Sequence, residues 1–345
     1  MLSAETERTG WFAVAPIALA MALVSATAFA QVGFAEIKPP DDAVEYSSVY
    51  SKVFFASETV GFLVGEQSLE YEKATVAVTR DKGATWEVMP GLSVGRLMGG
   101  AFLDENNGWT VGEAGTILAT DDGGKSWDTQ TSKVTVDLQD AFFLTEDVGW
   151  VVGNNSTALG TKNGGRSWQI LAGGTPSGQV GEGEVTFVAA HFFDEKNGIV
   201  AGAGIEGVIE TTTDGGKTWE AVHPSEDNYG GLTFADANVG WAVGKYGLIH
   251  ATTDGGKTWT PQDSSTEEDI WAISASSPTT AWYSGDLGTI GYTTDGGATW
   301  QTVGVQVEFF GQKKDLTRPI YGVAALGAKA WAATDYGRVL YFELQ

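Results

Sequence analysis

The sequence predicts an all-β fold, a seven-bladed β-propeller of four-stranded antiparallel blades with Asp-box turns. One unit recurs along the chain with a period of about 41 residues, as expected for four-stranded propeller blades. Within each unit, short apolar or β-branched segments alternate with glycine-rich turns, which is typical of antiparallel strands. The 3.6-residue periodicity of helices is absent from the repeats, so the pattern excludes a solenoid of helices.

The clearest copy of the unit reads Gly240-Trp-Ala-Val-Gly, then Gly247-Leu-Ile-His-Ala-Thr-Thr, then Asp254-Gly-Gly-Lys-Thr-Trp259. We interpret these pieces as the second strand, the third strand and the turn into a fourth strand. An apolar first strand precedes them at Leu232-Thr-Phe. Further copies cover residues 108–127, 149–168 and 281–300, and looser copies cover 61–86 and 198–219.

The seventh copy begins at Ala330 and ends before its fourth strand. The segment from Val32 to Ile37 lies outside the other copies, and we expect it to supply the missing strand. Pairing it with the end of the chain closes the ring and removes an exposed sheet edge. Residues 31–345 are therefore expected to form one propeller domain.

Six units contain an eight-residue element of the type Thr-x-Asp-x-Gly-x-Thr-Trp, known as an Asp-box. We expect its carboxylate to accept backbone N–H groups inside the turn, and its tryptophan to pack against the neighbouring sheet. Glycine supplies the positive φ that the turn requires. We predict a structural role for these acceptors and tryptophans, which are Asp81, Asp122, Asn163, Asp214, Asp254 and Asp295 with Trp86, Trp127, Trp168, Trp219, Trp259 and Trp300.

The chain is strongly acidic, with 20 Lys and Arg against 44 Asp and Glu and a formal net charge of −24. Such a charge repels nucleic acid and anionic lipid headgroups, so neither is expected as a partner. There is no cysteine, which excludes disulfides and thiolate metal sites. The three histidines (His191, His223 and His250) do not have the spacing of metal ligands, and we predict neither a metal nor a cofactor.

The amino terminus indicates export. An apolar run extends from Trp11 to Ala26, and Ala28-Phe29-Ala30 before Gln31 matches a signal-peptidase cleavage pattern. Residues 1–30 are predicted to be a signal peptide, or an anchor if they are not cleaved, because the run is long enough to span a bilayer. Either way the propeller is expected in the periplasm, and after cleavage without direct insertion into the membrane.

Three insertions interrupt the repeat, at Glu66–Lys73, Ala172–Glu184 and Thr302–Thr317. In a four-stranded blade, the loops between strands two and three and the links between blades emerge on one face, and the Asp-box turns emerge on the other. All three insertions are therefore expected on the face opposite the Asp-boxes. Variable loops on a rigid scaffold are where binding residues tend to lie.

Counting back six residues from the repeated Phe or Ala of each first strand gives seven positions expected to ring the channel mouth on that face. Arg96 and Arg318 are the strongest binding candidates among them. The alternative is a pair of solvated charges that balance Asp137 and Asp269. Trp271 joins the candidates because it is the one tryptophan after residue 30 that the repeat does not explain. The seven positions are Val49, Arg96, Asp137, Thr186, Asn228, Asp269 and Arg318.

The wording Gly-Trp-x-Val-Gly…Gly-x-Ile…Thr-Asp-Gly-Gly-x-x-Trp resembles the photosystem II stability and assembly factor family, from about residue 44 to residue 342. The resemblance implies a propeller with structural Asp-boxes and an arginine patch on the channel face. Arg96-Leu97 before Phe102 resembles one element of that patch, whereas other blades have Asp137, Thr186, Asn228 and Asp269. It also implies a non-enzymatic scaffold that binds a membrane protein or its exposed loops during assembly.

Two alternatives remain at this point. Sialidases share the Asp-box and need three arginines to bind a carboxylate, which would be Arg96, Arg318 and Arg338, because Arg80 and Arg166 lie inside Asp-box turns. A Ca²⁺ site at Glu267-Glu268-Asp269 is the other alternative, although no recognisable calcium loop surrounds it.

Overall fold

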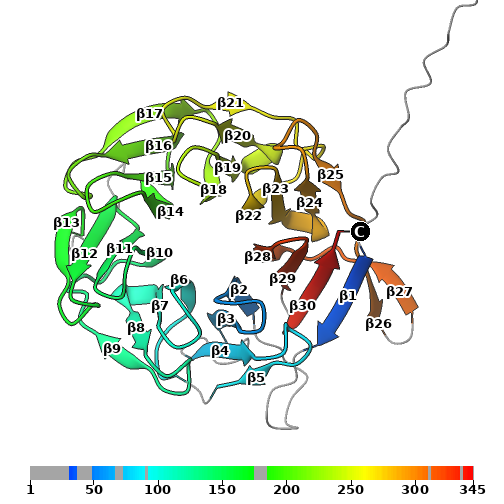
Figure 1. The fold of residues 1–345 in the computed structure, drawn as a ribbon, viewed down its shortest axis with the longest axis horizontal. Coiled ribbons are helices and arrows are strands. Elements are labelled where there is room, and N and C mark those ends of the chain that lie inside the picture. Colours follow the sequence, from blue (N-terminus) through cyan, green and yellow to red (C-terminus); the bar gives the residue numbers. More distant parts are fainter. Residues whose placement is uncertain are drawn as a thin grey trace, which may run out of the picture.

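The computed structural model describes residues 31–36, 49–66, 73–89, 92–174, 185–309, 312–334 and 337–344. The predicted signal segment lies outside the described residues, as does most of the first two insertions. Seven four-stranded antiparallel sheets surround a central axis in the described part of the chain, which confirms the predicted propeller (Figure 1). Among the described residues, no helix has the length and apolar character needed to cross a bilayer.

The first six blades follow the chain from the innermost strand outward. Blade one contains β2 (Val49–Phe55), β3 (Gly61–Glu66), β4 (Ala74–Thr79) and β5 (Glu87–Val88), and blade two contains β6 (Leu97–Phe102), β7 (Gly108–Gly112), β8 (Ile117–Thr120) and β9 (Asp128–Gln130). Blade three contains β10 (Leu138–Phe143), β11 (Val148–Gly153), β12 (Thr157–Lys162) and β13 (Gln169–Ala172), and blade four contains β14 (Thr186–Phe192), β15 (Gly198–Ala203), β16 (Gly207–Thr212) and β17 (Glu220–Ser225). Blade five contains β18 (Tyr229–Phe234), β19 (Gly240–Gly244), β20 (Ile249–Thr252) and β21 (Thr260–Pro261), and blade six contains β22 (Ile270–Ser277), β23 (Thr280–Gly285), β24 (Ile290–Thr293) and β25 (Gln301–Thr302). Three of them carry a one-turn 3₁₀ helix between the second and third strands: η1 (Glu113–Gly115), η2 (Lys245–Gly247) and η3 (Asp286–Gly288).

Blade seven combines the two ends of the domain. Its strands run in the order β28 (Ile320–Leu326), β29 (Lys329–Thr334), β30 (Arg338–Glu343) and β1 (Gln31–Glu36). Residues 31–36 pair antiparallel with residues 338–343, so the strand expected from the amino-terminal segment is the one that completes the blade. Figure 1 shows the blue β1 beside the red β30.

The Asp-box turns are closed by the predicted type of hydrogen bond. Oδ1 of Asp254 accepts the backbone N–H of Thr258 at 2.9 Å, and its Oδ2 accepts the Thr258 hydroxyl at 2.7 Å. These two bonds favour the charged form and lower the pKa of Asp254 to about 2. The same donors, from Ser126 and Thr218, lower the pKa of Asp122 and of Asp214 to about 2.

Blade three carries the neutral version of this turn. Oδ1 of Asn163 accepts the Ser167 N–H at 2.9 Å, but its Nδ2 must donate to the Ser167 hydroxyl at 3.0 Å. Replacing Asn163→Asp is expected to raise the melting temperature by about 1–3 °C at pH 7, because charge-assisted bonds are the stronger ones. Asn163→Ala, which has no acceptor, should lower it.

The gain from Asn163→Asp has a defined pH dependence. The folded-state pKa of such a box aspartate is lowered, so its contribution is present above the unfolded-state pKa and is lost as the pH falls through about 2. Thermal unfolding of both proteins at pH 7 and at about pH 2 checks this expectation. A difference between the two proteins that is unchanged at the lower pH would contradict it.

Tryptophans of several second strands join a blade to the next one. Trp109 stacks on Phe143 of blade three with ring centroids 3.6 Å apart, and its Nε1 donates to the carbonyl of Gly164 at 3.2 Å. Trp331 makes the same two contacts across the closure of the ring, with Phe55 at 3.9 Å and the carbonyl of Lys82 at 3.0 Å. One type of joint therefore recurs, including at the point where the ring closes.

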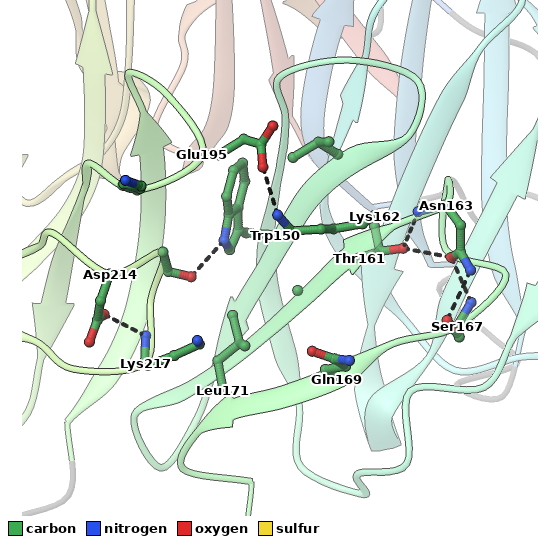
Figure 2. A pocket seen from close by; sticks show the side chains of 14 residues that line it. Trp150, Thr161, Lys162, Asn163, Ser167, Gln169, Leu171, Glu195, Asp214 and Lys217 are labelled. Atoms are coloured by element: carbon green, nitrogen blue, oxygen red, sulfur yellow. Dashed lines mark hydrogen bonds and ion pairs between the residues drawn. The ribbon is translucent and has the colours of Figure 1, made fainter.

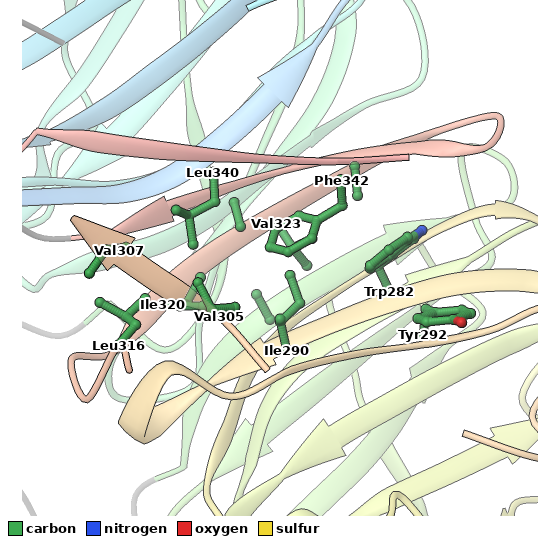
Figure 3. Close-up of a cluster of buried hydrophobic side chains, with 13 residues drawn as sticks. Trp282, Ile290, Tyr292, Val305, Val307, Leu316, Ile320, Val323, Leu340 and Phe342 are labelled. Carbon is green, nitrogen blue, oxygen red and sulfur yellow. The ribbon is translucent and has the colours of Figure 1, made fainter. Parts of the chain in front are cut away.

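The third insertion, residues 302–317, is partly structural. Residues 306–309 and 312–315 form a two-stranded hairpin, β26 (Gln306–Phe309) and β27 (Gln312–Asp315). At its base Val305, Val307 and Leu316 are buried against Ile290 and Phe342, between blades six and seven (Figure 3). Apolar residues at the base of the hairpin fix this insertion to the core.

Candidate binding face at the central channel

The two faces of the ring carry different turns and links, because neighbouring strands of each blade run in opposite directions. The Asp-box turns contact the loops between the first and second strands, for example through Gly123 N–H and the carbonyl of Asn106 at 3.0 Å. The turns between the second and third strands contact the links between blades, as Gly247 N–H does with the carbonyl of Glu268 at 2.9 Å. We call this second face the loop face, and the first the Asp-box face.

A β-bulge interrupts the pairing of every innermost strand at the same place. In β22, for example, Ile270 and Ala272 face consecutive residues of β23, which leaves Trp271 as the extra residue. A bulge re-aims the side chain that it inserts. All seven bulge residues line one hollow at the channel: Ser51, Met98, Gln139, Val188, Gly230, Trp271 and Tyr321.

The hollow has a volume of about 570 Å³ and opens on the loop face. Residues from the blade links and from the turns after the second strands complete its wall, including Arg96, Asn228 and Lys245. Trp271, Tyr321, Met98 and Val188 give it an apolar component. The volume and the mixed lining are those of a site for a peptide segment or a small organic ligand.

Two cationic side chains that line the hollow, Lys52 and Arg96, form ion pairs. The Nζ of Lys52 lies 3.8 Å from Oδ1 of Asp140, and Nη1 of Arg96 lies 3.9 Å from Oε1 of Glu66. Burial raises the pKa of Asp140 and that of Glu66, against the opposing effects of Lys52 and Arg96. At both carboxylates the effect of burial on the pKa exceeds that of the cationic neighbour.

The structure brings only some of the predicted rim residues together. Val49, Arg96, Asn228 and Trp271 line the hollow, and Nε1 of Trp271 donates to Oδ1 of Asp286 at 2.8 Å. Thr186 begins β14 opposite Ala203 and is not among the lining residues.

Asp137 and Asp269 have a structural role instead. Oδ1 of Asp269 accepts the backbone N–H of Tyr246 in η2 of the preceding blade at 3.0 Å. Asp137 accepts the N–H of Ala114 in η1 in the same way, also at 3.0 Å. Each carboxylate fixes a turn of its neighbour, so these two aspartates join blades and do not line the hollow.

The position of Arg318 corrects the expected alignment of blade seven. Ile320 pairs with Thr334 as Ile270 pairs with Gly285, so the residue equivalent to Asp269 is Pro319. Arg318 lies one residue earlier and is exposed. The expected position was one residue too early, because β28 has alanines where the first strands of most blades have a phenylalanine.

The bulge residues were missed at the sequence level, except for Trp271. They lie two positions after the expected rim residues in six blades, and they differ in every blade, so the repeat gives no identity to search for. The one signal that the sequence offered is this variation itself, at seven aligned positions of otherwise similar first strands. Trp271 was found because it is a tryptophan without a place in the repeat.

A second hollow, of about 400 Å³, lies on the Asp-box face between blades three and four (Figure 2). Its polar wall contains an ion pair between Nζ of Lys162 and Oε2 of Glu195 at 2.6 Å. Its apolar wall is Trp150, whose Nε1 donates to the carbonyl of Gly215 at 2.9 Å. The residues that line this hollow are thus residues whose contacts join blades three and four.

The histidines lie away from the channel. His191 is packed among Phe142, Phe193 and Phe234, and burial lowers its pKa to about 4. His250 in β20 shares a 2.7 Å hydrogen bond with Tyr229 in β18, within blade five. The described residues contain no group of three or more His, Cys, Asp or Glu side chains that could hold a metal ion.

A closed ring of Asp-box blades with one hollow formed by all seven innermost strands defines a ligand-binding β-propeller of the Asp-box class. The model of the family described as photosynthesis system II assembly factor YCF48 matches residues 94–175, 131–231 and 222–341. The chain belongs to this family, as its repeat wording indicated. No curated protein sequence matches it at a significant level.

Solved structures with the same fold include members of that family. YCF48 bound to a D1 peptide aligns with a TM-score of 0.67 and 20% identity, over 91% of this chain and 97% of that one. YCF48 from Cyanidioschyzon merolae gives 0.65 and 18%, over 90% and 98%. The WD40 β-propeller domain of Doa1 gives 0.63 and 14%, over 91% and 98%. At these identities the likeness shows the fold alone.

Proposed function

We propose that this protein is a non-enzymatic assembly factor that binds a segment of a membrane protein in the hollow at the channel mouth. The observation that carries the proposal is the ring of seven bulge residues, because every blade contributes one residue to one shared site. Family membership supports the role, and the D1 peptide bound to a relative of the same fold supports a polypeptide ligand.

The lining supports binding over catalysis. Among the described residues that line the hollow there is no histidine, and the one carboxylate, that of Glu66, is paired with Arg96. The sialidase alternative needs three arginines on one carboxylate. Of the described lining residues one is an arginine, Arg96, whereas Arg338 begins β30 of blade seven.

The proposal places the protein outside the cytoplasm, in the periplasm, either free or held by its amino-terminal segment. The apolar run and the Ala28-Phe29-Ala30 pattern before Gln31 support this location. In protein purified from cells, amino-terminal sequencing should then read Gln31 first, whereas an intact amino terminus indicates the anchored form.

Binding of a synthetic D1 peptide to the full chain tests the ligand. We expect Trp271→Ala and Arg96→Glu each to weaken binding by about tenfold or more, because they remove an aromatic anchor and reverse a charge at the centre of the site. Arg166→Glu is the matched control, since Arg166 lies in an Asp-box turn on the opposite face and should leave the affinity unchanged.

Capture from detergent-solubilised membranes extends the test to other partners. If the D1 peptide does not bind, a membrane complex that the wild type captures and Trp271→Ala loses identifies a different membrane-protein partner at the same site. Binding that neither variant affects, or no binding in either assay, would contradict the proposed function.

A further inference from the structure

The loop face carries three apolar side chains that project into solvent. Ile205, Tyr246 and Leu287 are 79%, 69% and 57% exposed, and they are the most exposed of the large apolar side chains in the described residues. Each lies in the turn between the second and third strands, in blades four, five and six respectively. We call these three residues the apolar arc.

The apolar arc occupies consecutive blades and has no counterpart in blades two and three. The same turn has Ala114 in blade two and Asn155 in blade three, one small and one polar. The corresponding turns of blades one and seven fall in or beside residues outside the described ranges. Isolated exposed apolar residues are ordinary, but three at equivalent turns of adjacent blades indicate an interaction surface.

Two members of the arc are held in an unfavourable backbone conformation. Tyr246 has φ 56° and Leu287 has φ 52°, in the left-handed region that side chains other than Gly and Asn rarely adopt. Such a conformation brings Cβ close to the backbone and is unfavourable for side chains of this kind. A glycine or asparagine would fit these turns better, so folding alone does not explain an exposed Tyr and Leu there.

Neighbouring contacts make these turns rigid. Asp269 of the next blade accepts the Tyr246 N–H at 3.0 Å, and the N–H of Gly247 donates to the carbonyl of Glu268 at 2.9 Å. In η3 the Thr289 N–H donates to the carbonyl of Asp286 at 2.8 Å. Fixing apolar side chains before binding lowers the entropy cost of association.

The surroundings of the arc are acidic. The loop-face turns of blades four to six, together with the links from blade four to five and from blade five to six, contain eight carboxylates and one lysine, Lys245. The carboxylates are Glu206, Glu226, Asp227, Asp263, Glu267, Glu268, Asp269 and Asp286. An apolar surface with such a rim is complementary to an apolar surface with basic residues around it. The same rim repels the anionic headgroups of a membrane surface.

We propose that the apolar arc is a second docking surface, which binds a basic amphipathic segment of a protein partner. This proposal rests on the proposed function, since both take the partner to be a protein, but the docking surface consists of residues outside the channel hollow. Ile205, Tyr246 and Leu287 insert into the apolar side of that segment, and the carboxylates pair with its basic residues. Docking there places the partner beside the hollow on the same face.

A triple variant tests the arc without damaging the fold. Ile205→Ser with Tyr246→Asn and Leu287→Asn removes the apolar tips, and asparagine suits the positive φ at both turns. Its melting temperature should equal or exceed that of the wild type. Leu144→Ser with Ile170→Ser and Val222→Ser is the matched control, because these residues are 36–44% exposed elsewhere on the molecule.

The probe is a synthetic amphipathic peptide of leucine and lysine, offered to the immobilised full chain. Its counterpart has glutamate in place of every lysine. We expect the Leu/Lys peptide to bind the wild type and the control about tenfold or more tightly than the arc variant. The Leu/Glu peptide should bind far more weakly, and added salt should weaken the Leu/Lys peptide.

Equal binding of the Leu/Lys peptide to the arc variant and to the control would overturn the proposal, as would tighter binding of the Leu/Glu peptide. Loss of binding to phosphatidylcholine vesicles in the arc variant, without a change in peptide binding, would overturn it in favour of a lipid surface. Binding of the D1 peptide is measured on the same immobilised proteins. Its failure to bind contradicts the proposed ligand of the hollow and leaves the result for the arc standing.

Discussion

Replacing Phe34→Pro together with Ala35→Pro is expected to lower the free energy of unfolding by about 3–5 kcal/mol. Adjacent residues of an antiparallel strand point their N–H groups to opposite sides, so one of the two prolines removes a donor to β30 whichever the register. Proline also breaks the regular strand. Blade seven then lacks its outer strand, and β30 becomes an unpaired edge.

Denaturant unfolding of the full chain measures this loss. Thr129→Pro with Gln130→Pro is the control, in the outer strand β9, which pairs only within blade two. We expect a smaller loss there, because β9 does not join distant parts of the chain. A pair of prolines in β1 that leaves stability unchanged would show that the ring holds without this strand.

Trp331→Ala is expected to cost about 3–5 kcal/mol, the range for removing a buried aromatic side chain. Trp331 is 1% exposed, and it both stacks on Phe55 and donates to the carbonyl of Lys82 across the closure. Trp331→Phe keeps a ring to stack and removes only the N–H donor. It should cost about 1–2 kcal/mol, the effect of one lost hydrogen bond.

Trp109→Ala provides the comparison within the chain, because Trp109 makes the equivalent contacts with Phe143 and the carbonyl of Gly164. Similar losses at both sites, measured by denaturant unfolding, would show that the closing joint is as strong as an internal one. A loss below about 1 kcal/mol for Trp331→Ala would contradict the role given to it.

The repeat made most of the fold predictable. Gly, Trp and Asp recur because each turn needs a positive φ, each joint needs a stacked ring and each Asp-box needs an acceptor, and these requirements are local in sequence. The closing strand was also predictable, since a copy that lacks one strand must obtain it elsewhere. Asp137 and Asp269 were placed near the mouth, but their bonds to the preceding blade could not be read from the sequence.

The binding hollow was less predictable, for a physical reason. A β-bulge is a feature of the backbone pairing between two strands, and a single sequence carries no mark of where the register shifts. Nothing in the sequence therefore singles out Met98 or Tyr321. The hairpin of β26 and β27 was hidden in the same way, because Val305 and Leu316 become apolar partners only when the chain returns on itself.

The pairing of β1 with β30 has a consequence for how the protein is made. Residues 31–36 are synthesised about 300 residues before their partners at 338–343. Contacts between such distant segments form late, because the whole intervening chain must be ordered first. Until β30 is available, β1 has no partner within the chain, and its open edge can pair with another chain. Pairing of β1 with β30 therefore completes the ring and protects this edge from aggregation in the same step.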